Sequence, residues 1–259
     1  MTAGLPEGAR RRWIAGWAVV LLALGPAAGA VDGPRPGDDA TYRPTVMVRK
    51  GSALGTGTVI ASVEGETLIL TAWHVVDGPG PLHVELFRYN LGMERARAAP
   101  GFPRHWRASV AARDVDADLA ILRIGGQLAL PYRARMPRAG EPLAPGTAVA
   151  TIGFDKGQRL VGFETRTRGV ERIDMERGGG DRPFLVTDNA PELGRSGGGL
   201  FRADNGALVG VCVARAEPAR GRKIGLFSTL GNVKVLLRSH EDLAAAVARA
   251  NAGGRGPAR

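Results

Sequence analysis

The chain has 259 residues, which is enough for one large all-β domain or two smaller units with a substantial buried core. Its 38 glycines, 17 prolines and 5% aromatic residues predict many turns and short strands rather than long helices. The formal charge of +10 is typical of proteins with acidic partners, but the arginines are scattered without a dense basic run beyond the N-terminus, so we expect no nucleic-acid partner.

The N-terminal segment has the pattern of a secretory signal. Arg10-Arg11-Arg12 precede an apolar run from Trp13 to Leu24, and the small residues Ala28-Gly29-Ala30 follow. A basic region, an apolar core and a small-x-small end together predict a signal peptide over residues 1–30 with cleavage after Ala30. We therefore expect an exported protein, either periplasmic or extracellular.

An uncleaved membrane anchor is the alternative for the same segment. No charged residue occurs from Trp13 to Val31, a stretch just long enough to span a bilayer. The helix-breaking pair Gly25-Pro26 argues against a spanning helix and favours cleavage. Membrane contact is expected only if residues 13–31 stay attached.

Short apolar runs alternate with turns after a Gly-, Pro- and Asp-rich linker at residues 31–41. The runs have the length and β-branched content of strands, and no helical period links them. The first set is 45–48, 57–61, 67–71, 82–86 and 119–124, and the second set is 148–153, 160–163, 169–173, 184–187, 208–214 and 224–227. A Gly- and Pro-rich connection at 125–145 separates the two sets.

Two barrels of antiparallel strands fit this all-β pattern better than one sandwich. We place barrel one at about residues 42–124 and barrel two at about 146–230. Apolar residues spaced among charges predict a terminal helix at about 232–250, and residues 251–259 are expected to be a disordered tail. The single cysteine, Cys212, excludes an intrachain disulfide and is predicted to be a buried strand thiol.

The loop Gly194-Arg195-Ser196-Gly197-Gly198-Gly199 has the composition of a nucleophile loop. A serine hydroxyl is a poor nucleophile at neutral pH, so it needs a base, an orienter for that base and donors for the oxyanion. Because Gly194 lacks a Cβ, its N–H can turn into the same cavity as the N–H of Ser196. Gly-rich turns also contain serine for structural reasons, so the other groups decide the interpretation.

His74 is the candidate base. It follows the apolar run that ends at Thr71-Ala72, so its polar ring stands just beyond the strand and is an unfavourable choice for a core residue. The other histidines, His83, His105 and His240, are expected to be surface or structural residues.

Asp118 is the candidate orienter, because it stands directly before the apolar strand that begins at Leu119. We expect it to be the most buried of the acids Asp114, Asp116 and Asp118. A buried aspartate needs a partner, and the Nδ1–H of His74 would provide one while leaving Nε2 for Ser196. A calcium loop is the alternative, but it requires a Gly and a bidentate Glu that this sequence lacks. We therefore expect no metal and no cofactor.

Three motifs, Thr-Ala-x-His, Asp-Leu-Ala-Ile-Leu and Gly-x-Ser-Gly-Gly, occur in the order His, Asp, Ser. In this order they resemble chymotrypsin-fold serine proteases, and more closely the protease domain of the bacterial Deg/HtrA type. Further matching segments are 55–60, 146–153, 187–190, 205–211 and 225–234. The resemblance covers about residues 42–240 and does not include the PDZ domain that Deg/HtrA proteins usually append.

The resemblance implies two antiparallel six-stranded β-barrels with a C-terminal helix, and polypeptide substrates. His74 would be the general base and then the acid, Asp118 the orienter and Ser196 the nucleophile, with the N–H groups of Gly194 and Ser196 as the oxyanion hole. Arg195 stands where secreted digestive relatives carry an Asp that pairs with a newly cut N-terminus. Activation by that ion pair is therefore not expected.

The resemblance also implies a pocket for the residue before the scissile bond. It places Ala190 near the base of this pocket, Val213 and Ala214 along one wall, and Phe227 with its neighbours along another. Because no acid stands at Ala190, we expect a small or medium apolar residue in the pocket. A Glu192 side chain that pointed into the pocket would overturn this expectation.

The sequence thus predicts a serine endopeptidase that acts through an acyl-enzyme. A catalytically weak or inactive binding protein on the same fold is the alternative, because fold alone does not establish activity. An esterase would more often show an α/β pattern around Gly-x-Ser-x-Gly, which is absent.

Overall fold

The computed structural model describes residues 38–63, 65–93, 101–126, 129–137, 143–175, 180–217 and 223–252. The predicted signal peptide, residues 31–37 of the predicted linker and residues 253–259 of the predicted tail lie outside this set. Within these ranges, no helix combines the length and the apolar character that a membrane crossing requires.

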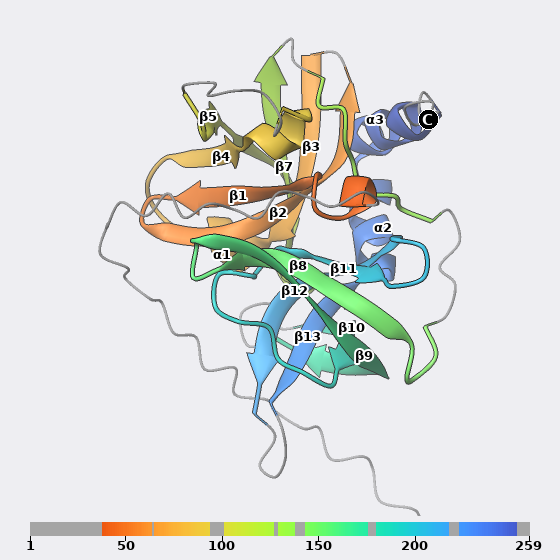
Figure 1. Cartoon of the computed structure of the whole chain (residues 1–259). Coiled ribbons are helices and arrows are strands. Elements are labelled where there is room, and N and C mark those ends of the chain that lie inside the picture. Colours follow the sequence, from red (N-terminus) through yellow and green to blue (C-terminus); the bar gives the residue numbers. More distant parts are fainter. Residues whose placement is uncertain are drawn as a thin grey trace, which may run out of the picture.

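The described residues form two β units and a pair of C-terminal helices (Figure 1). The first unit contains β1 (Thr45–Lys50), β2 (Ala53–Val63), β3 (Gly65–Ala72), β4 (Leu82–Leu86), β5 (Arg104–Arg107), β6 (Ser109–Asp114) and β7 (Leu119–Gly126). The second unit contains β8 (Ala148–Asp155), β9 (Arg159–Asp174), β10 (Asp181–Thr187), β11 (Gly199–Arg202), β12 (Leu208–Ala216) and β13 (Ile224–Thr229). The helices are η1 (Asp38–Ala40), α1 (Trp73–Val76), η2 (Arg88–Leu91), α2 (Leu230–Arg238) and α3 (Glu241–Ala252).

The first unit is an antiparallel seven-stranded sheet in the order β5-β4-β1-β2-β3-β7-β6. It therefore differs from the six-stranded barrel that the resemblance implies. Strands β5 and β6 both lie outside the apolar runs named from the sequence, and β5 is exposed except for the partly buried Trp106. Strands β5 and β6 form the two edges of the sheet and are not hydrogen-bonded to each other.

The second unit is the predicted six-stranded barrel, closed in the order β10-β13-β12-β11-β8-β9. Its closure depends on β9, a single strand where the sequence predicted two. The first part of β9 pairs with β8, and the part from Thr167 onward pairs with β10. A register shift between Val186 and Thr187 of β10 faces Gly169, whose φ of +139° suits only glycine. This irregularity lets one strand turn the corner of the barrel.

One helix was predicted at the C-terminus, and this prediction is wrong in number, because two helices are present. Ser239 and His240 separate α2 from α3. Their side chains bond to carbonyls one turn back, with Ser239 Oγ 3.2 Å from Val235 O and His240 Nδ1 3.0 Å from Leu236 O. These contacts satisfy the carbonyls that the end of a helix leaves without partners, so α2 ends there.

An apolar cluster joins the two units to the helices. Ile60 and Leu70 of the first sheet share this cluster with Phe154 of the barrel and with Val233 and Leu243 of the helices. Helix α3 packs against β2, so the last described helix returns to the first unit (Figure 1). The mainly β fold with a helical C-terminus is confirmed.

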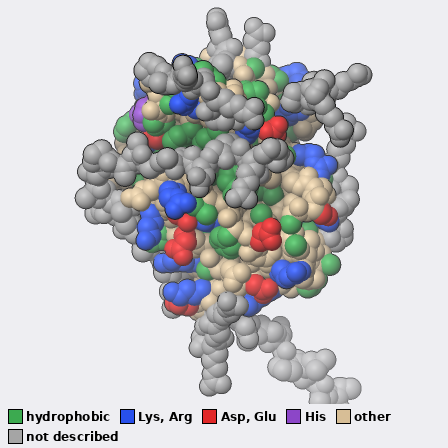
Figure 2. All heavy atoms as spheres, viewed as in Figure 1, with side chains coloured by type: hydrophobic (Ala, Val, Ile, Leu, Met, Phe, Trp, Pro, Cys, Tyr) green, Lys and Arg blue, Asp and Glu red, His purple; other side chains and the backbone are tan. Residues whose placement is uncertain are grey.

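The surface mixes the two signs of charge. On the face shown in Figure 2, arginines and lysines lie among aspartates and glutamates, and apolar side chains occur between them. Ion pairs such as Arg172 with Asp181 and Arg168 with Asp188 lie on exposed parts of the barrel. Such exposed pairs contribute little to stability individually.

Candidate active site

His74 lies on α1, the single helical turn that follows β3. Val75 and Val76 of this turn are buried and fix its position under the sheet. Val75 packs closely against the backbone of Gly55. A Cβ at Gly55 would lie only 2.5 Å from Val75 Cγ1, so a side chain there would clash. The imidazole itself is 14% exposed, which leaves one part of the ring open to the surface.

Asp118 holds the histidine through two hydrogen bonds. Its Oδ1 accepts from the backbone N–H of His74 at 2.9 Å, and its Oδ2 lies 2.6 Å from His74 Nδ1. The backbone carbonyl of Asp118 also accepts from Trp73 N at 3.1 Å. Both the ring and the turn that carries it are therefore fixed by one residue. When Nδ1 bears the proton, Nε2 is left as the basic nitrogen.

The turn before β7 presents Asp118 to the histidine. Asp118 has a φ of +50°, a left-handed conformation that Asp tolerates better than bulky residues. Ala117 N donates to Asp114 Oδ1 at 3.0 Å, and Asp118 N donates to Val115 O at 3.2 Å. The Asp118 side chain is 6% exposed, against 14% for Asp114 and 25% for Asp116. The expectation that Asp118 is the most buried of the three acids is confirmed.

The other two carboxylates of this turn contact the second unit. Arg182 on β10 lies 2.9 Å from Asp116 Oδ2 and 3.6 Å from Asp114 Oδ2. Across the described ranges, no three His, Cys, Asp or Glu side chains are grouped so that they could hold a metal ion.

The serine loop is built so that only glycine fits after Ser196. A Cβ on Gly197 would lie 2.1 Å from Thr56 O and 2.2 Å from Thr71 Oγ1, and the φ of Gly197 is +86°. A Cβ on Gly198 would lie 2.3 Å from Ile152 O. The Gly-rich composition therefore reflects close packing of the loop on three strands.

The same contacts bring Ser196 to the histidine side of the molecule. Thr56 N on β2 donates to Ser196 O at 2.8 Å, and Thr71 near the end of β3 donates through Oγ1 to Thr56 O at 2.7 Å. A Cβ on Gly55 would touch both Val75 and Ser196 O. The partly exposed Ser196 thus lies beside the junction of β3 and α1, where His74 is located.

Contacts of the neighbouring backbone orient the N–H groups of Gly194 and Ser196, the two predicted oxyanion donors. The carbonyl of Leu193 accepts a hydrogen bond from Lys156 N at 2.7 Å. In a trans peptide the C=O and the next N–H point in opposite directions, so the N–H of Gly194 faces away from Lys156. No described residue accepts a hydrogen bond from the N–H of Gly194 or of Ser196. Both donors are therefore available to a bound oxygen.

Arg195 has an internal partner. Its side chain is 2% exposed, and its guanidinium pairs with the carboxylate of Asp155 at the end of β8. Arg195 therefore takes no part in an ion pair with a newly cut N-terminus, in agreement with the expectation from the sequence. Neither the sequence motifs nor the resemblance identified Asp155 or Lys156, because no local pattern marks a contact between the β8–β9 turn and a loop about 40 residues away.

The four predicted pocket residues differ in exposure. Ala190 and Ala214 are partly exposed, whereas Val213 and Phe227 have no exposed surface. Phe227 lies in an apolar cluster inside the barrel with Leu185, Val209 and Cys212, so its side chain packs the core. Glu192 is exposed to solvent.

Cys212 is buried on β12, as predicted. Burial raises the pKa of its thiol to about 12, and the nearby Arg195 cation opposes this increase only in part. The backbone of Cys212 supports the serine loop, since its carbonyl accepts from Gly197 N at 2.7 Å and its N–H donates to Gly198 O at 2.8 Å.

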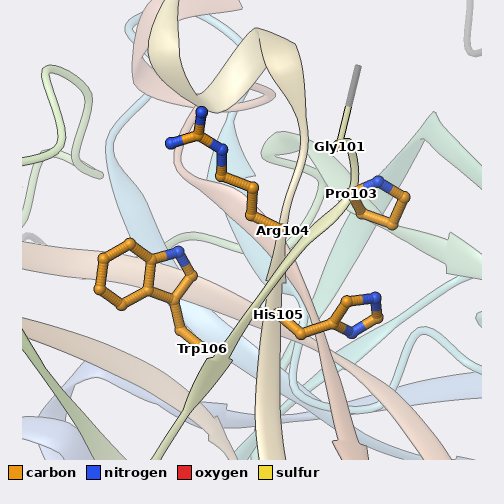
Figure 3. A pocket seen from close by; sticks show the side chains of 5 residues that line it. All are labelled: Gly101, Pro103, Arg104, His105 and Trp106. Atoms are coloured by element: carbon orange, nitrogen blue, oxygen red, sulfur yellow. The ribbon is translucent and has the colours of Figure 1, made fainter. Parts of the chain in front are cut away.

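An open hollow of about 490 Å³ lies elsewhere, at the edge strand β5. Figure 3 shows its lining residues Gly101, Pro103, Arg104, His105 and Trp106, with Arg104 and Trp106 on one side of the strand and His105 on the other. None of the predicted site residues lines it.

A His–Asp pair beside a Gly-rich serine loop, placed between a β-sheet and a closed β-barrel, defines the class of chymotrypsin-fold serine hydrolases. The chain matches the family model of the trypsin-like peptidase domain over residues 55–211, and it belongs to this family.

Individual relatives agree with this assignment. Protease Do-like 14 of Arabidopsis thaliana is 28% identical over 181 residues, which are 67% of this chain and 38% of that protein. The chain therefore spans well under half the length of this curated relative. The predicted resemblance to trypsin-like proteases of the Deg/HtrA type is confirmed.

Solved structures show the same fold. The active form of the Rv3671c protease from M. tuberculosis has a TM-score of 0.60 and 24% identity, covering 85% of this chain and 93% of that one. The HtrA-type protease AlgW, solved with a tripeptide, has a TM-score of 0.61 and 21% identity, covering 78% of this chain and 61% of that one.

Proposed function

We propose that this chain is a serine endopeptidase that hydrolyses peptide bonds through an acyl-enzyme. The observation that carries the proposal is the double hydrogen bond from His74 to the carboxylate of Asp118, next to the loop of Ser196. This arrangement matches the general requirement of a nucleophile, a base and an orienting group. Family membership adds support from the sequence.

In the first half of the reaction, Ser196 Oγ attacks the carbonyl carbon of the scissile bond, and its proton passes to Nε2 of His74. The carbonyl oxygen becomes an oxyanion and accepts hydrogen bonds from the N–H groups of Gly194 and Ser196. The C–N bond then breaks, and His74 gives its proton to the leaving amine. An acyl group remains on Ser196.

In the second half, a water molecule attacks the acyl carbon while His74 takes one of its protons. The oxyanion forms again at the same two N–H groups. Collapse of this intermediate breaks the bond to Ser196 Oγ, which recovers the proton from His74, and releases the new carboxyl end. Throughout, Asp118 keeps the imidazole in place and stabilises its protonated form.

Labelling with a fluorophosphonate probe tests the nucleophile directly. We expect the unmodified protein to be labelled at Ser196 and Ser196→Ala to remain unlabelled. Ser109→Ala, which changes an exposed serine on β6, is the matched control and should label like the unmodified protein. A folded protein that stays unlabelled would favour the alternative of an inactive binding protein.

A small or medium apolar side chain before the scissile bond is the proposed specificity. Support comes from the partly exposed Ala190 and Ala214, which offer methyl groups and no charge, and from the solvent exposure of Glu192. Cleavage of a peptide library tests this specificity. A profile dominated by Arg or Lys at this position would reject it.

Export is proposed from the N-terminal composition alone. The basic, apolar and small-residue regions of residues 1–30 support a cleaved signal. N-terminal sequencing of protein recovered from outside the cytoplasm should begin at Val31. Recovery of a membrane-bound chain that retains residues 13–31 would instead support the anchor.

A further inference from the structure

The residue before the nucleophile, Arg195, is a buried cation. Its Nε and Nη2 donate to the two carboxylate oxygens of Asp155, with Nη2 3.1 Å from Oδ2. Nη1 donates to Thr151 O at 3.4 Å, and the guanidinium carbon lies 4.7 Å from the centre of the Phe163 ring. A buried guanidinium is costly unless it is paired in this way, so the carboxylate determines where Arg195 can lie.

The β8–β9 turn that carries Asp155 supports the same loop through its backbone. Lys156 N donates to Leu193 O at 2.7 Å. A Cβ on Gly194 would lie 2.4 Å from Phe154 O and 2.9 Å from Lys156 N, so the glycine backbone rests directly on the turn. The turn itself is closed by Gln158 N donating to Asp155 O at 2.9 Å.

The side-chain contact and the backbone contact therefore act on neighbouring parts of the serine-loop backbone. The Lys156 contact fixes the Leu193–Gly194 peptide, and the Asp155 contact fixes Arg195, which stands between the two N–H donors of the oxyanion hole. Both contacts come from adjacent residues of one turn, Asp155 and Lys156. The spacing of the two donors depends on the position of this turn.

We propose that Asp155 is a positioning residue for the oxyanion hole and acts through Arg195; this inference rests on the proposed serine endopeptidase activity. The carboxylate does not touch the substrate. It fixes the backbone whose N–H groups receive the oxyanion. Because that contact develops only when the carbonyl oxygen becomes charged, loss of Asp155 should lower kcat more than it changes KM.

The test uses Asp155→Asn, Arg195→Met and the double variant that combines them. Kinetics on a peptide substrate give kcat and KM. Affinity for a peptide boronic acid, which forms a tetrahedral adduct with an active serine, measures the oxyanion hole separately. Asp204→Asn is the matched control, since it removes the exposed partner of Arg202 in the same barrel.

For Asp155→Asn we expect kcat to fall about 10²-fold, as when an oxyanion donor is lost, with KM within about threefold of its starting value. Affinity for the boronic acid should fall in parallel, while affinity for the product peptide stays the same. Asp204→Asn should match the unmodified protein in all these measurements.

The double variant separates positioning from the cost of a lone buried charge, because it contains neither charge. We expect it to regain stability relative to Asp155→Asn while kcat stays low. An unchanged kcat in Asp155→Asn, a kcat that follows only the folded fraction measured by near-UV circular dichroism, or full recovery of kcat in the double variant would each overturn the inference. Failure of the proposed function looks different, because then the unmodified protein is not labelled at Ser196.

Discussion

The backbone N–H of Thr56 donates a hydrogen bond to the carbonyl oxygen of Ser196, 2.8 Å away. Thr56 belongs to β2 of the first sheet, and Ser196 belongs to the second unit. The Thr56 side chain adds two bonds, because its Oγ1 donates to Gly194 O at 2.9 Å and accepts from Phe154 N at 3.0 Å. One threonine thus connects the nucleophile loop, the β8 strand and the sheet that carries His74.

Thr56→Val should reduce both stability and turnover. The change removes two hydrogen bonds and leaves the buried N–H of Phe154 without its acceptor, which costs about 1–3 kcal/mol. Movement of Gly194 should also lower kcat. Urea unfolding and peptide hydrolysis measure the two effects.

Thr58→Val is the matched control for this prediction. Thr58 lies two residues further along β2 and is equally buried, but its hydroxyl has no hydrogen-bond partner among the described residues. Removing that hydroxyl should leave stability unchanged or raise it. Equal losses in the two valine variants would show that the Thr56 hydroxyl bonds are unimportant.

Gly197→Ala should prevent the serine loop from forming its present structure. The new Cβ would overlap Thr56 O at 2.1 Å and Thr71 Oγ1 at 2.2 Å, and the left-handed φ of +86° adds strain. We expect a loss of more than about 2 kcal/mol in the free energy of unfolding, because a left-handed backbone alone costs about 1–2 kcal/mol. Labelling at Ser196 by the fluorophosphonate should be lost as well.

Gly65→Ala isolates the contribution of the backbone conformation. Gly65 has nearly the same φ, +85°, but a Cβ there would meet nothing within 4 Å. Gly65→Ala should therefore lower the free energy of unfolding by about 1–2 kcal/mol and leave labelling at Ser196 intact. If both alanine variants lose the same stability, the close approach of Gly197 to β2 and β3 is not a constraint.

Asp118→Asn should lower kcat by about 10⁴ while the protein stays folded. The new amide oxygen can accept a hydrogen bond from an N–H of His74. The new amide NH2 group, however, is a donor, so it favours the tautomer in which Nδ1 is unprotonated and Nε2 carries the proton. Asn tolerates the φ of +50° at this position. Asp116→Asn, which changes the partly exposed partner of Arg182, is the control and should retain activity.

Cys212 should resist alkylation in the folded protein. With a pKa of about 12, only about 1 in 10⁴ of its thiol is ionised at pH 8, and the group is buried as well. Iodoacetamide should modify it only as the chain unfolds, so urea should accelerate the reaction sharply. Rapid modification without urea, measured by mass spectrometry, would contradict the buried thiol.

Local sequence patterns predicted the strands that local apolar content determines. The run at 82–86 is β4, and the runs around Val59, Ile69 and Ile121 lie within β2, β3 and β7, because strand length and apolar content decide these segments. The His–Asp contact was predictable because a carboxylate at the start of a buried strand needs a partner.

Other features depend on contacts between distant parts of the chain. Strand β5 has no apolar run, and it is held by its pairing with β4 and by the packing of Trp106 against the apolar cluster of the sheet. Similarly, β9 continues through residues 164–168 because β8 and β10 bond to it on either side of the bend. Tertiary pairing overrides weak local preference in both cases.

The partner of Arg195 shows the same limit within the site. The sequence marked Arg195 as unusual next to a nucleophile, but nothing local indicated that its counter-ion is Asp155. The closeness of the two residues results from the antiparallel pairing of β8 with β11, which places the end of β8 beside the serine loop that leads into β11.

The attachment of the serine loop to β2 has a thermodynamic consequence for ligands. A substrate or inhibitor that bonds to Ser196 of the barrel also requires His74 of the first unit, so it binds at the interface between the two units. Separating the two units would then require releasing the ligand, and occupancy at 100 times Kd should stabilise the whole chain by about 2.7 kcal/mol. A ligand of the active site is therefore also expected to stabilise the association of the sheet with the barrel.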